Sequence, residues 1–364
     1  MPHSVIDTAS LGDAVNRYGA TAARKASPEK GRVKTKTVDI HSHIAVPEAA
    51  RFAQPHLTLT DIPMVRHSND QTKSINGQQD KDRTVAMTDM DDRIAVLDAM
   101  RIDFQLVAPP PFQCYYTLRT EEAVKATKIV NEGIAAFVNK RPDRFAGLGT
   151  VTLQDGATAA EELSFCVNDL GLKGVQVLTN VNGNELSAPQ YEPFWRKAEE
   201  LGCLVMIHPN GFTEGRRFEE HYFSNVIGNP LETTVALHRL IFDGVLERLP
   251  NLKILAVHGG GFLPAYSGRI DHAWGARQDS RAGLPKPPTE YLKKVYFDSV
   301  VFTPHQLEYL VKLYGADKIV MGTDYPYDMA DYDPVEHILS TPLSDEERSK
   351  VAGLTALKLL GLSA

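Results

Sequence analysis

The feature that most constrains the fold of this chain is a repeated alternation of short apolar runs with longer amphipathic stretches. Eight of the runs have the length and composition of buried β-strands, and most are followed by a helical pattern. They are Lys36–Ile40, Phe104–Ala108, Phe145–Thr150, Gly174–Leu178, Leu204–Ile207, Lys253–Val257, Val295–Ser299 and Lys318–Met321. Eight strands with a crossover after each is the count of a closed parallel barrel, so we predict a (β/α)8 TIM barrel.

An open doubly wound sheet is the alternative, because it has the same local pattern. No glycine-rich phosphate fingerprint follows the first strand, which favours the barrel. Pro304 lies just inside the start of one predicted helix, and Ser344 and Glu347 have capping-box spacing before the last one. The clearest helical patterns are Glu121–Asn139, Tyr191–Leu201, Glu232–Leu249 and Thr303–Tyr314.

The chain of 364 residues is long enough for two domains, but a barrel with insertions commonly reaches this length as one. We predict an N-terminal extension at 1–32, partly helical around Leu11–Tyr18, and one barrel domain at 33–364. The segment Gln54–Thr88 is rich in Asn, Gln, Asp and Lys. We expect it to be a long inserted loop after strand one that covers the barrel mouth, since such loops are usually functional or disordered.

The composition excludes several classes of protein. The formal net charge is −7, so no basic field favours nucleic acid as a partner. No apolar run reaches the ~20 residues of a membrane span, and the N-terminus lacks the apolar region of a secretory signal. Cys114, Cys166 and Cys203 are widely spaced, which is typical of core thiols in a reducing compartment. We therefore expect a cytoplasmic protein.

The first chemical motif is Asp39-Ile40-His41-Ser42-His43, at the end of the first predicted strand. Side chains two apart in an extended segment point the same way, so the two imidazoles are presented together. Imidazole nitrogens suit zinc and neighbouring divalent metals. An HxH pair alone is weak evidence for a metal site.

Three later strands also end in side chains that bind metals or transfer protons. His208 follows the fifth strand, His258 begins a His-Gly-Gly-Gly segment after the sixth, and Asp324 follows the eighth in Gly-Thr-Asp-Tyr-Pro. Barrel strands deliver catalytic groups at their C-terminal ends. A single histidine there is more often structural, but four such strand ends indicate a metal centre at the barrel mouth.

These motifs resemble the amidohydrolase superfamily, and more narrowly its 2-amino-3-carboxymuconate-6-semialdehyde decarboxylase-like branch (amidohydrolase 2). The resemblance covers about 38–362, and its most specific parts are the segments "DIHSHI", "HGGGFLPAYSGRIDHAW" and "GTDYPYD". It implies a mononuclear metal with a water in its shell, bound by His41, His43, His208 and Asp324. It also implies that His258 is the acid/base residue and that Asp324 takes part in proton transfer.

The resemblance further implies how substrate is bound. Arg269 matches an arginine that enters the neighbouring subunit's site and binds a substrate carboxylate, which implies a homodimer. A second carboxylate-binding arginine is expected in the segment after strand one, where either Arg83 or Arg66 fits. Asn210 departs from the pattern, because the decarboxylase compared has an aromatic residue there. The residue at position 210 and the open identity of the second arginine both concern the substrate pocket, and neither affects the metal ligands.

The predicted function is non-oxidative decarboxylation of an aromatic or unsaturated carboxylic acid, with one divalent metal. Zinc is preferred and manganese is the alternative. A mononuclear hydrolase or hydratase acting on a small carboxylate is the rival function, because the same metal-water serves these reactions. The binuclear hydrolases of the superfamily usually have a lysine at the end of strand four. Here Lys173 lies at the beginning of that strand, which disfavours a second metal.

Overall fold

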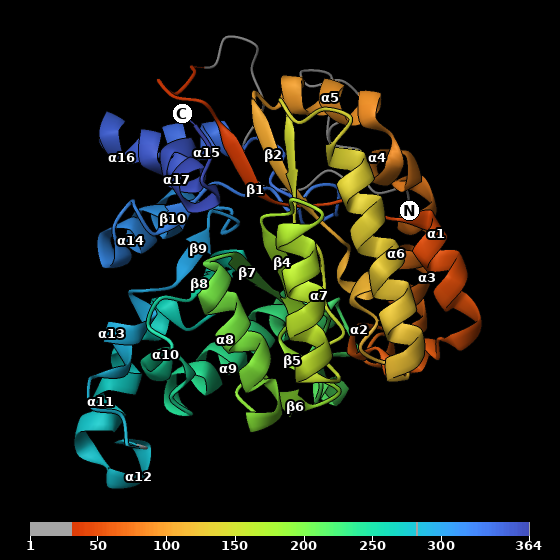
Figure 1. Cartoon of the computed structure of the whole chain (residues 1–364). Coiled ribbons are helices and arrows are strands. Elements are labelled where there is room, and N and C mark those ends of the chain that lie inside the picture. The colour runs from red at the N-terminus through yellow and green to blue at the C-terminus, as the bar shows by residue number, and fades with distance from the viewer. Residues whose placement is uncertain (1–30, 282, 364) are drawn as a thin grey trace.

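A computed structural model describes residues 31–281 and 283–363. The predicted N-terminal extension, including its helical pattern, lies outside these residues except for Gly31 and Arg32. The described chain is a ring of short strands surrounded by helices (Figure 1).

Eight parallel strands form the barrel, in two hydrogen-bonded groups ordered β1-β2-β3 and β10-β9-β8-β7-β4. Two parallel bridges join the groups: Ser42 pairs with Tyr325, and Gly149 pairs with Val175. The ring is therefore closed, and the open-sheet alternative is excluded. The strands are β1 Val38–His43, β2 Phe104–Ala108, β3 Phe145–Gly147, β4 Gly174–Leu178, β7 Leu204–His208, β8 Lys253–Ala256, β9 Tyr296–Asp298 and β10 Ile319–Val320.

Helices connect the strands on the outside of the ring, as the alternating pattern predicts. The capping box of Ser344 and Glu347 is present, and Pro304 begins α14. The main outer helices are α5 Met90–Ala99, α6 Thr120–Val138, α7 Gly156–Asn168, α8 Glu192–Leu201, α9 Asn229–Phe242, α13 Pro288–Leu292, α14 Pro304–Tyr314 and α17 Thr355–Leu360. A two-residue hairpin, β5 Asn180–Val181 with β6 Asn184–Glu185, follows β4.

One predicted helix is divided. The pattern predicts a single helix over Glu232–Leu249, but the chain forms α9 and then α10 Val245–Arg248. Gly244 lies between them with φ of +77°, a left-handed conformation that ends the first helix. The apolar periodicity continues across the break, which is why the sequence reads as one helix.

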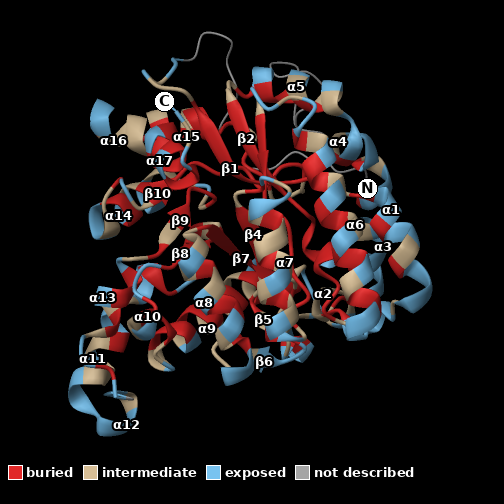
Figure 2. Ribbon diagram, viewed as in Figure 1, coloured by how far each residue is buried: buried red, intermediate tan, exposed pale blue. Residues whose placement is uncertain are grey.

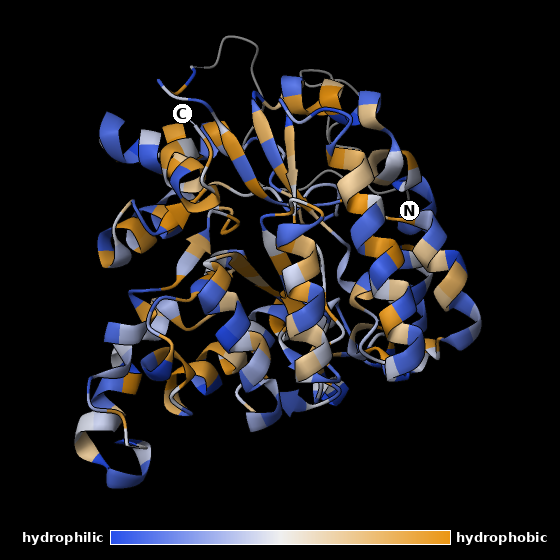
Figure 3. Ribbon diagram, in the orientation of Figure 1, coloured by the Kyte–Doolittle hydropathy of each residue, from blue (hydrophilic) through white to orange (hydrophobic). Residues whose placement is uncertain are grey.

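The core has two parts. Inside the ring, side chains such as Ile40, Leu106 and Met206 are fully buried, and residues of α17 pack against this cluster. A larger cluster fills the space between the strands and the outer helices. Figure 2 shows the strands buried along their length, and Figure 3 shows apolar residues concentrated on the strands and the inner helix faces.

The expectation of a long loop at Gln54–Thr88 is wrong, because much of this segment is helical. It contains short 3-10 turns and α2 Pro63–Arg66, α3 Asp70–Asp82 and α4 Thr84–Thr88. In α3 only Thr72 and Gln79 are buried, and the helix is started by Asn69, whose side chain accepts from the Thr72 N–H at 2.8 Å. A helix with almost no apolar face lacks the periodicity by which the sequence would predict it.

The three cysteines are buried and free, so the prediction of core thiols is confirmed. Within the described ranges, none of the helices has the length and apolar composition needed to cross a membrane.

Candidate metal centre

The first two metal-binding side chains come from β1. His41 and His43 are fully buried, and their Nε2 atoms lie 3.3 Å apart. The register of β1 against β2 shifts between Asp39 and Ser42, so that β1 has one residue more than β2 in this stretch. Such a bulge bends a strand and re-aims its side chains, and bulges are frequent beside active sites.

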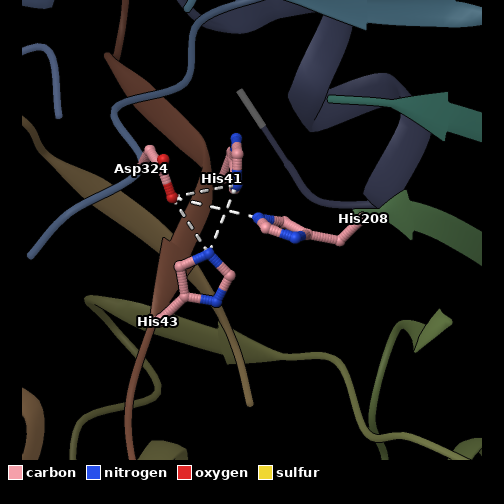
Figure 4. Close-up of side chains that lie close together, drawn as sticks. All are labelled: His41, His43, His208 and Asp324. Carbon is pink, nitrogen blue, oxygen red and sulfur yellow. Dashed lines mark hydrogen bonds and ion pairs between the residues drawn. The ribbon is translucent and has the colours of Figure 1, made fainter. Parts of the chain in front are cut away.

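His208 at the end of β7 and Asp324 after β10 complete the group (Figure 4). Asp324 Oδ1 lies 3.2 Å from His43 Nε2, 3.4 Å from His41 Nε2 and 4.0 Å from His208 Nε2. One ligand atom from each residue falls within 4.8 Å of all the others. The structure thus brings together the four side chains predicted as ligands from segments almost 300 residues apart.

The outer ring nitrogens hold each imidazole with its Nε2 toward the centre. His43 Nδ1 donates to the Pro109 carbonyl at 3.0 Å, and His208 Nδ1 donates to the Pro209 carbonyl at 2.7 Å. His41 Nδ1 lies 2.6 Å from Asp298 Oδ2. A hydrogen bond at Nδ1 fixes the tautomer that leaves Nε2 free to bind a metal.

The residues present fit a divalent cation. The His208 Nε2 atom is buried and has no hydrogen-bond partner among the described residues, an arrangement that costs free energy unless something binds there. Burial lowers the pKa of His43 and holds the pKa of His208 well below its ordinary value, so both imidazoles stay neutral. Neutral imidazoles and one carboxylate are the ligands preferred by zinc and its neighbours.

The charge of Asp324 is also maintained. Burial alone would raise its pKa, but His41, His258 and His43 outweigh this effect and hold the pKa well below its ordinary value. Asp324 has φ of +62°, and its backbone N–H donates to the His41 carbonyl at 2.8 Å. A non-glycine residue in this conformation is uncommon and is concentrated at functional sites.

His258 lies beside the four-residue group. Its Nε2 is 3.4 Å from Asp324 Oδ2, and its ring centroid is 5.2 Å from that of His208 and 5.3 Å from that of His41. Its side chain is 16% exposed, whereas the side chains of the four ligands are at most 8% exposed. His258 is therefore placed to exchange a proton with a bound molecule while facing Asp324.

The three glycines after His258 let the chain turn sharply at this point. His258 itself has φ of +55°, and Gly259, Gly260 and Gly261 also have positive φ. A Cβ on Gly261 would lie 2.2 Å from the Pro230 carbonyl oxygen, so only glycine allows this close approach.

Asp298, at the end of β9, is a supporting residue that the sequence analysis did not identify. Its carboxylate accepts from His41 Nδ1, from the His258 N–H at 3.0 Å and from the Gly259 N–H at 2.8 Å. It therefore orients one metal ligand and fixes the turn that carries His258. The available signal was similar to that for the ligands, namely a carboxylate at the end of an apolar strand.

A second supporting network lies below the site. Asp39 is fully buried and accepts from the Thr323 hydroxyl at 2.6 Å and from Gln105 Nε2 at 2.7 Å. Arg93 donates to Gln105 Oε1 at 2.9 Å and also to the His43 carbonyl. Burial raises the pKa of Asp39 to about 6, while these hydrogen bonds counteract the rise. The network joins β1, β2 and the end of β10 where the ligands emerge.

The two arginines considered for substrate binding occupy different places. Arg83 is buried at the end of α3, donates to Gln79 Oε1 at 2.9 Å and lies over the Tyr327 ring at 4.8 Å. The Tyr327 ring is in turn 5.2 Å from that of His43, so Arg83 is one aromatic ring from the metal centre. Arg66 is about half exposed and donates to the Thr60 carbonyl at 2.9 Å.

Arg269 lies on α11 Gly268–Ala276, which projects from the body together with α12 Gln278–Arg281 (Figure 1). The side chain is exposed, and no hydrogen bond or ion pair involves it within the part of the chain that the structure describes. The neighbouring Asp271 accepts from Thr289 at 2.6 Å. The intrachain ion pair that Asp271 could have offered is therefore not formed.

A closed (β/α)8 barrel with three histidines and one aspartate converging at its mouth defines a barrel protein with a divalent metal site. The chain belongs to the amidohydrolase family, whose model matches residues 38–362. The resemblance to the 2-amino-3-carboxymuconate-6-semialdehyde decarboxylase-like branch of that family is confirmed.

Individual relatives support this family assignment. The chain is 33% identical over 328 residues to the 2-amino-3-carboxymuconate-6-semialdehyde decarboxylase of Dictyostelium discoideum, covering 89% of this chain and 91% of the relative. It is 29% identical to the gamma-resorcylate decarboxylase of Rhizobium sp. (strain MTP-10005), and the match covers 75% of this chain and 87% of the relative. A crystal structure of 2,6-dihydroxybenzoate decarboxylase complexed with 2,6-dihydroxybenzoate superposes on this chain with a TM-score of 0.77 at 25% identity. The match covers 90% of this chain and 100% of that structure's chain.

Proposed function

We propose that this protein is a metal-dependent, non-oxidative decarboxylase of an aromatic or unsaturated carboxylic acid. The observation that carries the proposal is the position of His258, which faces Asp324 beside a buried group of four metal-binding side chains. The three relatives described above bear decarboxylase names, which supports this reaction over the hydrolase or hydratase alternative.

In the reaction, the bond between the substrate's carbon and its carboxylate breaks, and CO₂ leaves without the bonding electron pair. A proton delivered by His258, directly or through Asp324, forms the new C–H bond with that pair. A divalent ion, when bound, supplies positive charge that holds a substrate oxygen and stabilises the negative charge that develops. Proton transfer of this kind contributes typically ~10²–10⁴-fold to the rate.

One ion per chain is proposed. Among the described residues a single group of side chains has metal-binding geometry, and Lys173 precedes β4 rather than following it. Zinc is preferred for three imidazoles and a carboxylate, and manganese is the alternative. The free, buried thiols suit a reducing compartment, and the cytoplasm is the proposed location.

Arg83 is proposed to bind a substrate carboxylate within its own chain, and Arg269 to do so from a second copy. Exposed aromatic side chains surround the start of α11: Tyr266 is 70% exposed, Phe262 45% and Tyr309 44%. Single exposed apolar residues are ordinary, but several beside an unpaired arginine suit a protein interface. We propose a homodimer that buries this surface.

The test of the reaction is CO₂ release from a panel of ortho-hydroxybenzoates and unsaturated dicarboxylates by chelated protein reloaded with zinc or manganese. We expect release only after reloading and about one ion per chain. His258→Ala should keep the ion and lose turnover by about 10²-fold or more. Hydrolysis or hydration without CO₂ release would reject the decarboxylase assignment, and loss of the ion in His258→Ala would make His258 a ligand.

The test of the shared site mixes two inactive variants, His258→Ala and Arg269→Ala, under conditions of subunit exchange. A hybrid dimer contains one site with both defects and one intact site, so activity should return on mixing. No recovery despite verified exchange would contradict the contribution of Arg269 to its partner.

A further inference from the structure

A cavity of about 360 Å³ adjoins the metal centre without containing it. It opens where β2, β4 and β7 end, and Leu178 and Asn210 form part of its wall. Leu178 is the register partner of His208 across β4 and β7, and Asn210 follows His208 by two residues. Since neighbouring strands lie ~5 Å apart, the cavity shares a wall with the ligand-bearing end of β7.

Several polar side chains of this wall have no hydrogen-bond partner within the described part of the chain, and two of them, Thr179 and Asn210, lie beside the end of β7. Thr179 is only 2% exposed, and neither its hydroxyl nor the Asn210 amide makes a hydrogen bond to any residue of 31–281 or 283–363. The hydroxyls of Tyr115 and Tyr116 are also buried without a partner among these residues, whereas Asn180 donates to Glu232 at 3.1 Å and Asn182 donates to the Tyr116 carbonyl at 2.7 Å. Buried hydroxyls such as those of the two tyrosines call for a partner, and the Thr179 hydroxyl and the Asn210 amide, which line the cavity, are free to bind an occupant.

The inner part of the cavity carries no net charge. Its charged lining side chains, Asp61 and Arg66, are both about half exposed at the rim and lie 4.0 Å apart, so they offset each other. A carboxylate placed deep in the cavity would be buried without a cation, which is strongly unfavourable. The remaining walls include Phe112, Tyr115 and Leu178, which suit the flat face of an aromatic or conjugated group.

We infer that this cavity receives a neutral, oxygen-bearing substituent of the substrate, such as a hydroxyl, ether or carbonyl group, with Thr179 and Asn210 as its hydrogen-bonding partners. The inference rests on the proposed function, since it extends the same substrate site. It specifies the substrate as an acid whose end remote from the reacting carboxylate is polar but uncharged.

The test uses metal-loaded protein and three ortho-hydroxybenzoates. They carry a methyl, a methoxy or a second carboxylate group on the side of the ring away from the reacting carboxylate. Dissociation constants come from calorimetry, and CO₂ release is measured in parallel. We expect the methoxy compound to bind about tenfold more tightly than the methyl and carboxylate compounds, since one hydrogen bond between neutral groups contributes about that factor.

Thr179→Val and Asn210→Leu keep the size of each side chain and remove its hydrogen bonds, so each should reduce the methoxy preference severalfold. Asn168→Leu, at the exposed end of α7, is the matched control and should leave the preference unchanged. If Thr179→Val does not fold, the more accessible Asn210→Leu carries the test.

The outcomes separate the two proposals. A preference that both variants abolish, without any CO₂ release, would support the cavity assignment and reject the decarboxylase. CO₂ release with equal binding of the three compounds, or with a preference that neither variant changes, would overturn the cavity assignment alone. Tightest binding of the carboxylate compound, or no binding of any compound, would also overturn it.

Discussion

Replacing Asp298 by asparagine tests whether metal binding depends on a side chain outside the ligand group. The asparagine has the same shape, but an amide nitrogen replaces one acceptor oxygen. Asp298 Oδ2 faces His41 Nδ1 at 2.6 Å and the His258 N–H at 3.0 Å, while Oδ1 faces the N–H groups of Gly259 and Val300 at 2.8 and 3.2 Å. In either orientation of the amide, two of these donors lose their acceptor.

The magnitude follows from those contacts. When the amide nitrogen takes the place of Oδ2, the bond that orients His41 is lost. A hydrogen bond to a charged group contributes about 1.5–3 kcal/mol, so metal binding should then weaken about 10- to 150-fold. The independent range for partners of metal ligands, about 10–100-fold in affinity or activity, agrees with this value. Turnover should fall further than metal occupancy, because the same carboxylate also fixes the backbone of His258.

The assay is competition between the protein and a chelator of known affinity, followed by turnover at saturating metal. Asp169→Asn changes an exposed carboxylate on the outer surface and serves as the matched control. Wild-type metal affinity together with wild-type turnover in Asp298→Asn would refute the supporting role of Asp298. Full restoration of turnover by excess metal would restrict that role to His41.

Four further predictions follow from individual groups. Burial raises the pKa of Glu162 to about 7 from its usual 4.5, so the stability that this group contributes is lost as pH rises through that range. Glu162→Gln should therefore remove about 2–3 kcal/mol of pH-dependent stability, measured by melting experiments between about pH 4.5 and 8. Burial alone would lower the pKa of His41, but neighbouring carboxylates raise it above its ordinary value, so metal affinity should fall as acidification protonates this imidazole first. Gly261→Ala should cost more than about 2 kcal/mol of unfolding free energy, because its Cβ would meet a carbonyl oxygen at 2.2 Å. A bound substrate analogue should slow hydrogen exchange across 54–88 if this segment covers the site, and unchanged exchange at saturation would contradict a cover.

The barrel and its metal centre were predictable because their signals are local. The predicted bounds of β2 and β4 agree with the structure at both ends, and the ligands lie within three residues after the apolar runs. The rule that side chains meet at the C-terminal mouth of a barrel then brings distant residues together without any knowledge of the register. His41 and Asp324 are the clearest example, since 283 positions separate them.

The helices of the inserted segment were not predictable by the same reasoning. Helix α3 is polar on all sides, and its stability comes from an asparagine cap and from contacts such as that of Asn69 with Glu220 at 3.0 Å. Asp298 was missed for a different reason. Its strand-end position was visible, but its role depends on the His41 ring that it faces, and that pairing appears only in three dimensions.

In the proposed assignment, the residues that carry the reaction and those that select the substrate come from different segments. The four ligands come from β1, β7 and the end of β10, whereas most of the adjoining cavity is formed by segments after β2 and β4. These segments can change without disturbing the ligands, except at β7, where His208 and Asn210 are two residues apart. Asn210 is also the position at which this chain departs from the aromatic residue of the decarboxylase it resembles. A substitution there exchanges an apolar wall for a hydrogen-bonding one while His208 stays in place, so under the proposed assignment the same metal centre would serve a substrate with a more polar remote end.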